Sequence, residues 1–255
     1  MAVSDIPAGS TAIVTGGGRG IGRAIARGLA SAGVRCAVAD IDVANARAVA
    51  GEIGQGAIAI ETDVTAETSV RAMAETCLGA FGKVDILVNN AAINMSTSSF
   101  ALKPFWELGL DEWNAVLSVN ATGTFLASRA VAPGMRARRA GRIVNLTSTA
   151  VALGRPNYLH YIASKAAIIG MTRSMARELG RDNITVNAVS PGPVVTEVER
   201  KPVSQEQQRR MLEMQCIAEP IQADDVAGAV LFLCSTGSRL ITGQVTTVDG
   251  GAVHT

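Results

Sequence analysis

The sequence predicts a single α/β domain built on a doubly wound parallel sheet of about seven strands, with helices on both faces. Short apolar segments alternate with longer helical patterns along the whole chain, and strands joined by helical crossovers pair in parallel. Hydrophobic residues make up 48% of the chain but aromatic residues only 4%, so the core must consist of Ala, Val, Ile and Leu, as in buried parallel strands. The 255 residues suit one large domain, and no linker or internal repeat divides them.

The expected strands are short runs of β-branched and small apolar residues bounded by turn residues. They lie at 11–15, 34–39, 57–60, 84–89, 142–147, 185–189 and 244–248. Helical patterns fill the intervals, at 20–32, 44–53, 68–81, 111–138, 158–179 and 223–235. Asp42 and Asp111 occupy positions where side-chain N-caps would begin two of these helices.

Two long segments break this alternation. Residues 94–109 are rich in Ser and lack a pattern, and residues 191–215 begin with Pro-Gly-Pro before a polar, helix-like run at 204–214. Long irregular segments inside a compact α/β domain are usually functional. In a doubly wound sheet both would lie beyond the carboxyl ends of the strands, where ligands bind, and we expect a substrate lid around 194–215.

Composition excludes several classes of function. A net charge of +1 gives no electrostatic footprint for nucleic acid or an anionic membrane. The cysteines lack CxxC spacing and are expected to be buried free thiols, and a total of two histidines argues against a metal site. The chain shows no signal-peptide pattern and no apolar segment of about 20 residues, so we expect a cytoplasmic protein.

The first expected strand leads into a glycine-rich turn, Thr15-Gly-Gly-Gly-Arg-Gly-Ile-Gly22, and then directly into a helix. Glycine lacks a Cβ, so the backbone of such a turn can bring its N–H groups close to a pyrophosphate. The N-terminus of the following helix adds about half a positive charge. The turn therefore predicts a dinucleotide site, although its spacing is not the literal G-x-G-x-x-G.

The second expected strand ends at Asp40, which bears on the choice of dinucleotide. A carboxylate there would accept hydrogen bonds from both hydroxyls of the adenosine ribose and would repel a 2′-phosphate. Arg19 in the glycine turn would have the opposite effect if it paired with a 2′-phosphate. We give Asp40 more weight because it would face the ribose directly, and we predict NAD rather than NADP.

Tyr161 and Lys165 are separated by one helical turn and share a helix face. A free phenol has a pKa near 10, so a tyrosine that acts as a base near pH 7 needs its pKa lowered by about 3 units, or about 4 kcal/mol. An ammonium a few ångströms away supplies about that much at an effective dielectric constant near 20. The pair therefore predicts an acid/base centre.

Several motifs occur in a fixed order: Thr15-Gly-x-x-x-Gly-x-Gly22, Asp63-Val64, Asn89-Asn90-Ala91, Asn120, Ser148, Tyr161-x-x-x-Lys165 and Pro191-Gly192. In this order they resemble the short-chain dehydrogenase/reductase family, in its single-domain branch, over nearly the whole chain. The segments 141–149 and 160–165 are also similar to bacterial NAD-dependent secondary-alcohol dehydrogenases. The resemblance implies a Rossmann-type fold and hydride transfer between a substrate carbon and nicotinamide.

The resemblance assigns catalytic roles to four residues. Tyr161 would exchange the proton of the substrate alcohol, and Lys165 would lower the pKa of Tyr161 and hold the nicotinamide ribose. Ser148 would hydrogen-bond the substrate oxygen, and Asn120 would support a water-linked proton path to Lys165.

The resemblance also implies a set of cofactor contacts, from adenine at Asp63 and Val64 to the nicotinamide carboxamide at Val194 and Thr196. The chain departs from the family at Ala92, where Gly is usual, and Ala at a positive φ would cost on the order of 1 kcal/mol. No metal ligand is expected. The residues expected to bind NAD are Gly16, Arg19, Gly20, Ile21, Gly22, Asp40, Asp63, Val64, Asn90, Ala91, Tyr161, Lys165, Pro191, Gly192, Val194 and Thr196.

These observations predict an NAD-dependent enzyme that interconverts a secondary alcohol and a ketone, with a substrate pocket framed by 94–100, 151–158 and 196–214. Two alternatives stay open. One is a 3-oxoacyl thioester reductase acting on acyl carrier protein or CoA esters, which would normally use NADPH. The other is a non-catalytic dinucleotide-sensing protein, against which the intact set of four catalytic residues argues.

The expected partner is a small-molecule alcohol or ketone rather than nucleic acid or membrane, and the resemblance implies a homotetramer formed through the helices at 111–138 and 158–179.

Overall fold

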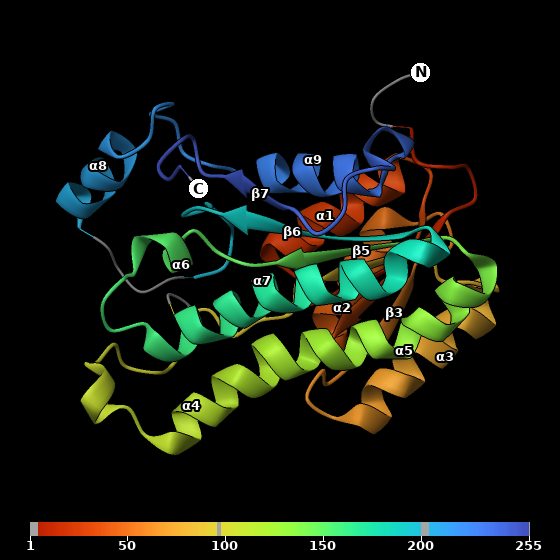
Figure 1. The fold of residues 1–255 in the computed structure, drawn as a ribbon, viewed down its shortest axis with the longest axis horizontal. Coiled ribbons are helices and arrows are strands. Elements are labelled where there is room, and N and C mark those ends of the chain that lie inside the picture. Colours follow the sequence, from red (N-terminus) through yellow and green to blue (C-terminus); the bar gives the residue numbers. More distant parts are fainter. Residues whose placement is uncertain (1–4, 96–97, 200–203, 255) are drawn as a thin grey trace.

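The strands of the structure form one parallel sheet in the order β3-β2-β1-β4-β5-β6-β7 (Figure 1). The computed structural model describes residues 5–95, 98–199 and 204–254. All neighbouring strands pair in parallel, which confirms the predicted fold class. The strands are β1 (Thr11–Thr15), β2 (Arg35–Asp40), β3 (Ile58–Glu61), β4 (Ile86–Asn89), β5 (Gly141–Leu146), β6 (Ile184–Pro191) and β7 (Val245–Val248).

Helices cover both faces of the sheet (Figure 1). One face packs against α1 (Gly20–Ser31), α2 (Val43–Ile53) and α9 (Ala223–Cys234). The other packs against α3 (Glu67–Phe81), α5 (Gly123–Arg138) and α7 (Leu159–Leu179). Successive strand residues alternate between the two cores, so that Val14 lies in the first and Ile13 in the second, and both are fully buried. Burial on both faces explains why the strands read as continuous apolar runs.

The helix predicted at 111–138 is interrupted in the structure. It consists of α4 (Leu110–Leu117), a π-helical turn at Ser118–Thr122, and α5. The N-cap predicted at Asp111 is wrong, because α4 begins one residue earlier and Gly109 is its N-cap, with no side-chain hydrogen bond. Asp111 lies in the first turn instead, where its charge still complements the helix dipole. The N-cap predicted at Asp42 is confirmed by hydrogen bonds of 3.1 Å from the amides of Ala44 and Asn45.

Two short helices lie in connections at the carboxyl edge of the sheet. One is α6 (Ala150–Leu153), which the sequence pattern did not indicate, and the other is α8 (Gln205–Glu213), within the polar run predicted to be helical.

Cys36, Cys77 and Cys234 are buried free thiols as predicted, and burial raises the pKa of each to about 12. The same prediction is wrong for Cys216, which follows α8 outside the two cores and is exposed. No helix among the described residues combines the length and apolar character needed to cross a bilayer.

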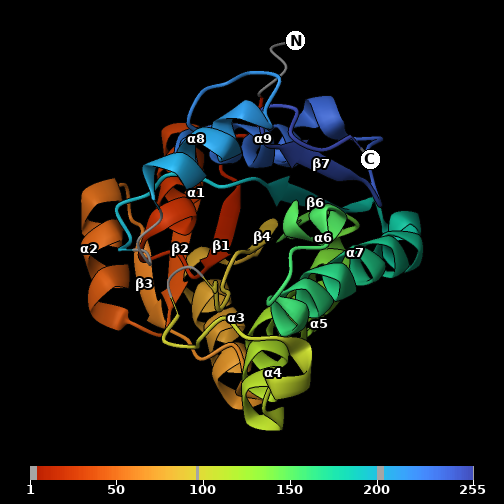
Figure 2. The ribbon, with the colours of Figure 1, turned by 90° about the vertical axis from the view of Figure 1, so that its left-hand side faces the viewer.

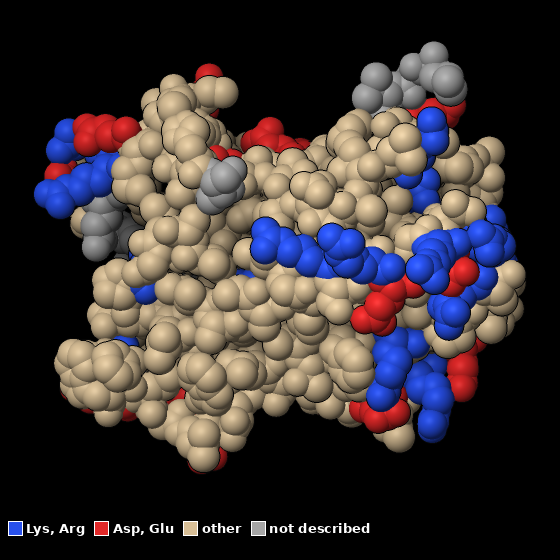
Figure 3. All heavy atoms as spheres, in the orientation of Figure 1, with Lys and Arg blue, Asp and Glu red and all other residues tan. Residues whose placement is uncertain are grey.

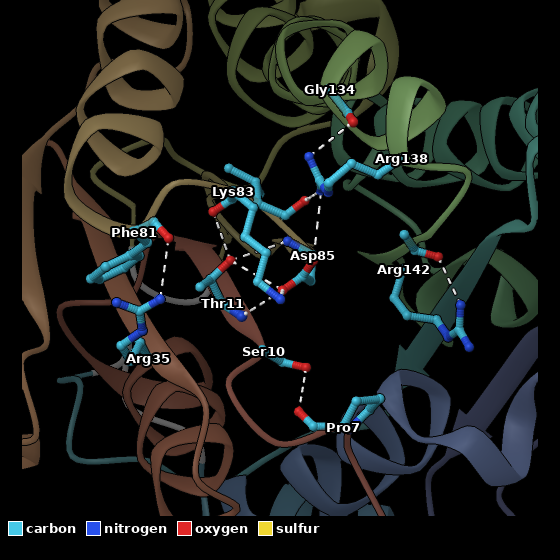
Figure 4. Close-up of polar contacts among 12 residues, drawn as sticks. Pro7, Ser10, Thr11, Arg35, Phe81, Lys83, Asp85, Gly134, Arg138 and Arg142 are labelled. Atoms are coloured by element: carbon cyan, nitrogen blue, oxygen red, sulfur yellow. Dashed lines mark hydrogen bonds and ion pairs between the residues drawn. The ribbon is translucent and has the colours of Figure 1, made fainter.

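The amino-terminal edge of the sheet is closed by a polar network (Figure 4). Asp85, just before β4, accepts a hydrogen bond of 3.0 Å from the Thr11 amide and pairs with the Lys83 ammonium at 2.8 Å. The Arg138 guanidinium, at the end of α5, lies 3.6 Å from the other carboxylate oxygen of Asp85. These contacts join β1, β4 and α5 at the edge opposite the glycine turn.

The carboxyl edge carries the loops that follow the strands (Figure 2). β2 and β3 follow each other on one side of β1, and β4 to β7 follow each other on the other side. The connections after β1 and β4 therefore run in opposite directions. A crevice forms at such a point, and doubly wound proteins bind their ligands there. The topology therefore places the crevice between the loops that follow β1 and β4.

Candidate active site

The glycine turn after β1 is held so closely that two of its positions admit only glycine. Gly16 has φ +61°, and a Cβ on it would lie 2.8 Å from Cα of Ala91. A Cβ on Gly22 would collide with the carbonyl oxygen of Gly16. Asn90 fixes the turn from β4, because its Nδ2 donates to the carbonyl oxygens of Gly16 at 2.8 Å and Thr15 at 3.1 Å. The turn is a rigid cradle of backbone N–H groups.

Asp40 lies at the end of β2, directly beside this cradle. Its Oδ2 accepts a hydrogen bond of 2.9 Å from the Gly18 amide, and its Oδ1 accepts one of 3.0 Å from the Asp42 amide. Arg19 is exposed and is the N-cap of α1 through its backbone alone. The carboxylate is thus fixed against the turn by two backbone hydrogen bonds.

Asp63 and Val64 follow β3 at the same edge. Asp63 accepts hydrogen bonds of 2.9 Å and 2.7 Å from the amide and hydroxyl of Thr65, which fix its carboxylate. The Val64 side chain is buried against Gly123 at the start of α5. The two residues are therefore held in place in the loop after β3, next to the end of β2 where Asp40 lies.

The segment after β6 lies over the start of α1. Pro191 ends β6, and its carbonyl oxygen accepts a hydrogen bond of 3.2 Å from the Thr149 hydroxyl. Val194 is buried. The Thr196 side chain approaches Gly20, since a Cβ on Gly20 would lie 3.7 Å from Cγ2 of Thr196. The structure thus joins the predicted residues after β6 to the glycine turn after β1.

Tyr161 and Lys165 project from the same face of α7, as their spacing predicted. Nζ of Lys165 lies 5.9 Å from the centroid of the Tyr161 ring. Both side chains are buried, and the ring of Tyr161 packs against Tyr158 with a centroid separation of 6.2 Å. The lysine ammonium and the tyrosine ring are thus buried together beside α7.

The carboxyl end of β5 anchors the lysine. Nζ of Lys165 donates a hydrogen bond of 2.8 Å to the carbonyl oxygen of Leu146, the last residue of β5. The Thr147 hydroxyl donates to the backbone carbonyl of Lys165 at 2.8 Å and fixes that turn of α7. Burial lowers the pKa of Lys165 to about 7, because desolvation disfavours the charged form. Ser148 follows at once, half-buried, with its Oγ accepting a hydrogen bond of 3.2 Å from the Ala150 amide.

Asn120 lies in the π-helical turn between α4 and α5 and is fully buried. Its Oδ1 accepts a hydrogen bond of 2.8 Å from the Ile93 amide, and its Nδ2 donates to Oγ of Ser164 at 2.9 Å. Ser164 in turn donates to the carbonyl oxygen of Tyr161 at 2.7 Å. Asn120 therefore connects the loop after β4 to the turn of α7 that carries Tyr161 and Lys165.

Sequence reasoning missed several residues that shape the site. Thr15 was quoted only as part of the glycine motif, yet its hydroxyl accepts hydrogen bonds from the amides of Asn90 and Ala91 at 3.1 Å and 3.2 Å. Glu197 belongs to none of the sequence motifs, yet it accepts a hydrogen bond of 3.0 Å from the Gly20 amide. Ala92 does not adopt a positive φ, so the departure from the family pattern causes no backbone strain there.

The predicted frame of the substrate pocket is described only in part. Residues 96–97 and 200–203 lie outside the described residues. Within the rest, Met95 is fully buried beside Tyr161, and the Arg155 guanidinium lies 4.5 Å from the centroid of the Tyr158 ring. Leu153 and Met214, two predicted walls of the pocket, are exposed at the carboxyl edge. The frame thus combines apolar surface with one cation near Tyr158.

The chain is similar to known proteins over nearly its whole length. The family described as Enoyl-(Acyl carrier protein) reductase matches residues 16–253. A probable galactose dehydrogenase of Rhizobium meliloti is 41% identical over 244 residues, which cover 94% of this chain and 93% of that protein. A solved 7α-hydroxysteroid dehydrogenase, complexed with NADH and 7-oxo glycochenodeoxycholic acid, has a TM-score of 0.92 and 36% identity over 100% of this chain and 98% of its own. A solved 3-ketoacyl-(acyl-carrier-protein) reductase from Brucella melitensis, complexed with NADH, has a TM-score of 0.87 and 33% identity over 96% of this chain and 98% of its own.

Proposed function

Since the chain belongs to the short-chain dehydrogenase/reductase family, we propose that it transfers a hydride between NAD(H) and a secondary alcohol or ketone. One observation carries the proposal. Nζ of Lys165 lies 5.9 Å from the Tyr161 ring centroid, at the sheet edge that also bears the glycine cradle. An acid/base pair beside a dinucleotide site is what alcohol oxidation requires.

The chemistry divides between the cofactor and the protein. When bound, NAD would supply the hydride-transfer chemistry of the reaction. Tyr161 takes the hydroxyl proton during oxidation and donates it during reduction, and Lys165 lowers the pKa of the Tyr161 phenol by its positive charge. Ser148 hydrogen-bonds the substrate oxygen, and Asn120 holds the turn of α7 that carries the pair.

The residues present fit NAD. The cradle after β1 leaves no room for a Cβ at Gly16 or Gly22, as close backbone approach to a pyrophosphate requires. Asp40 places a carboxylate at the end of β2, where the adenosine ribose binds in this fold. Both NADH-bound structures named above belong to close structural relatives. These points support NAD as the cofactor of this chain, with the contacts expected from the sequence.

Three broader assignments accompany this proposal. We infer that residues 194–215 form a substrate lid on a single catalytic domain, that four copies of the chain assemble through α4, α5 and α7, and that the enzyme works in the cytoplasm. The lid is supported by the position of Thr196, whose Cγ2 would lie 3.7 Å from a Cβ on Gly20 at the start of α1.

The function is tested by reduction of NAD⁺ across secondary alcohols, polyols and hydroxy acids. Tyr161→Phe should retain NADH binding but lose turnover by several orders of magnitude, because the phenylalanine ring keeps the packing and removes the exchangeable proton. NADH binding is followed by fluorescence titration, so a failure to fold would be seen. Near-normal turnover by Tyr161→Phe would exclude the mechanism.

A 3-oxoacyl thioester reductase is the second candidate, supported by the likeness to the Brucella melitensis enzyme. It is separated from the first by hydroxyacyl and oxoacyl thioesters assayed beside the alcohols, each with NADH and NADPH. A specificity constant that favours thioesters with NADPH would replace the leading proposal. Dinucleotide binding without turnover on either class would indicate a sensing protein.

A further inference from the structure

Glu197, in the segment that follows β6, holds the first amide of α1. Its Oε1 accepts a hydrogen bond of 3.0 Å from the Gly20 amide and lies 3.5 Å from a guanidinium nitrogen of Arg23. The first amides of a helix lack intrahelical partners, and the helix dipole favours an anion at that end. The carboxylate therefore occupies an anion position made by the chain itself.

This position belongs to the proposed cofactor site. Gly20 is part of the glycine turn, and Glu197 lines a hollow of about 420 Å³ together with Gly18 and Arg19 of the same turn. A dinucleotide brings its pyrophosphate to the helix N-terminus in this fold. One amide cannot serve the carboxylate and the phosphate fully at once, because both are anions and would repel each other at this distance.

We propose that Glu197 is an internal latch: in the cofactor-free protein its carboxylate takes the place of the cofactor phosphate at Gly20, and the dinucleotide must displace it to bind. The inference rests on the proposed function. Glu197 thereby weakens cofactor binding.

The segment that carries Glu197 is anchored at its base by a backbone hydrogen bond and a buried side chain. The Val195 amide donates a hydrogen bond of 2.7 Å to the Ile221 carbonyl, and Val194 is buried, so the base is fixed. Beyond it, the side chains of Thr196 and Val198 lie near Gly20, because a Cβ on Gly20 would lie 3.7 Å from Cγ2 of Thr196 and 3.4 Å from Cγ2 of Val198. Once the carboxylate leaves Gly20, the adjacent Thr196 is free to turn toward the cofactor, to which the family resemblance assigns it.

The electrostatics favour a charged latch that can be broken. Partial burial raises the pKa of Glu197, but the hydrogen bond from Gly20 and the charge of Arg23 outweigh it, so the pKa lies below its usual value. Half of the side chain is exposed, which keeps the interaction weak enough for a phosphate to compete. Arg23 also pairs with Glu52 at 2.9 Å, so it keeps a partner after Glu197 leaves.

The test compares Glu197→Gln with Glu199→Gln by calorimetric titration of the whole protein with NADH. Both side chains are exposed and line the same hollow, so each change removes one negative charge from it, but Glu199 has no hydrogen bond or ion pair among the described contacts. We expect Glu197→Gln to lower the dissociation constant for NADH by about three- to tenfold, because a charged hydrogen bond no longer has to be broken, and Glu199→Gln to leave it within about twofold.

ADP-ribose and adenosine identify the part of the cofactor concerned. Glu197→Gln should tighten ADP-ribose, which carries the pyrophosphate, and leave adenosine unchanged. Each of three results would overturn the latch. The two substitutions could tighten NADH binding equally, Glu197→Gln could leave the dissociation constant for NADH unchanged, or Glu197→Gln could tighten the binding of adenosine. If NADH binding changes as expected but the protein turns over no alcohol, the proposed function is refuted and the latch is not. If neither the wild-type protein nor Glu197→Gln binds NADH, both are refuted.

Discussion

At the scale of single residues, Lys165 lies in surroundings that oppose the charge of its ammonium. Its ammonium is buried, and its hydrogen bond to the Leu146 carbonyl only partly replaces water, so its pKa falls from 10.5 to about 7. The same burial strengthens its field at Tyr161, because a charge acts more strongly where water is excluded. The buried amine therefore costs the fold stability at the place where we propose an acid/base pair.

The cost of this buried amine predicts the pH dependence of stability. Between pH 7 and 10.5 the unfolded chain retains a proton that the folded protein has released, so the free energy of unfolding rises with pH across that window. Below pH 7 both states hold the proton, and the full cost is present. Lys165→Met should therefore stabilise the cofactor-free protein by a few kcal/mol at pH 6 and by progressively less toward pH 10, while abolishing turnover. Urea unfolding at a series of pH values measures this, and a loss of stability at pH 6 would contradict it.

Asp40 is predicted to select the cofactor. Asp40→Asn keeps an oxygen that can accept the hydrogen bond from the Gly18 amide but removes the charge that repels a 2′-phosphate. The ratio of the NADPH and NADH dissociation constants should shift toward NADPH by about tenfold or more. Asp42→Asn is the matched control, because Asp42 is the nearby N-cap of α2 and should leave the ratio unchanged. A ratio equal in all three proteins would remove Asp40 as the selector.

The sequence could predict which residues meet but not how some of them are held. The spacing of Tyr161 and Lys165 places both on one helix face whatever the surroundings. The hydrogen bond of Lys165 to Leu146 and that of Glu197 to Gly20 join segments far apart in the chain, and no local pattern encodes such pairings. Exposure is equally non-local, which is why Cys216 was wrongly expected to be buried.

At the scale of secondary-structure elements, periodicity predicted the regular parts well. β1 coincides with its prediction, and β6, expected at 185–189, spans Ile184–Pro191. The pattern could not reveal the π-helical turn at Ser118–Thr122, because one extra residue per turn shifts the apolar stripe too little to be seen in a single sequence. That turn carries Asn120, so the irregularity missed by the pattern lies at the candidate site.

Two glycines differ in whether the surrounding structure has room for a Cβ. A Cβ on Gly51 in α2 would meet no atom within 4 Å, so Gly51→Ala should raise the free energy of unfolding by about 0.5–1 kcal/mol through lower chain entropy. A Cβ on Gly22 would collide with the Gly16 carbonyl, so Gly22→Ala should lower it by about 2 kcal/mol or more and weaken NADH binding. Denaturant unfolding of the two variants checks both signs. Equal effects would mean that the glycine turn is not held as closely as the structure indicates.

At the scale of the whole molecule, α5 and α7 form an outer layer with no further element of the described chain over them (Figure 1). In the same orientation, Lys and Arg gather toward one end of this face, and the remainder is largely uncharged (Figure 3). Phe125 on α5 is 45% exposed, and the exposed surface of α7 includes the small residues Ala166, Ala167 and Gly170. Small residues allow helices of two subunits to approach closely, and a largely uncharged face is suited to burial.

Gly170→Arg tests whether this face is a subunit interface. A Cβ on Gly170 meets nothing within 4 Å in the single chain, so an arginine there should leave the fold intact and obstruct only a second copy of α7. The mass measured by light scattering should fall from that of a tetramer to that of a smaller species, with the far-ultraviolet circular dichroism unchanged. Gly51→Arg is the matched control, since Gly51 is equally open but lies on α2, away from α5 and α7, and should leave the mass unchanged. A wild-type protein that is monomeric, or a tetramer that survives Gly170→Arg, would show that the helices of this layer do not join the subunits.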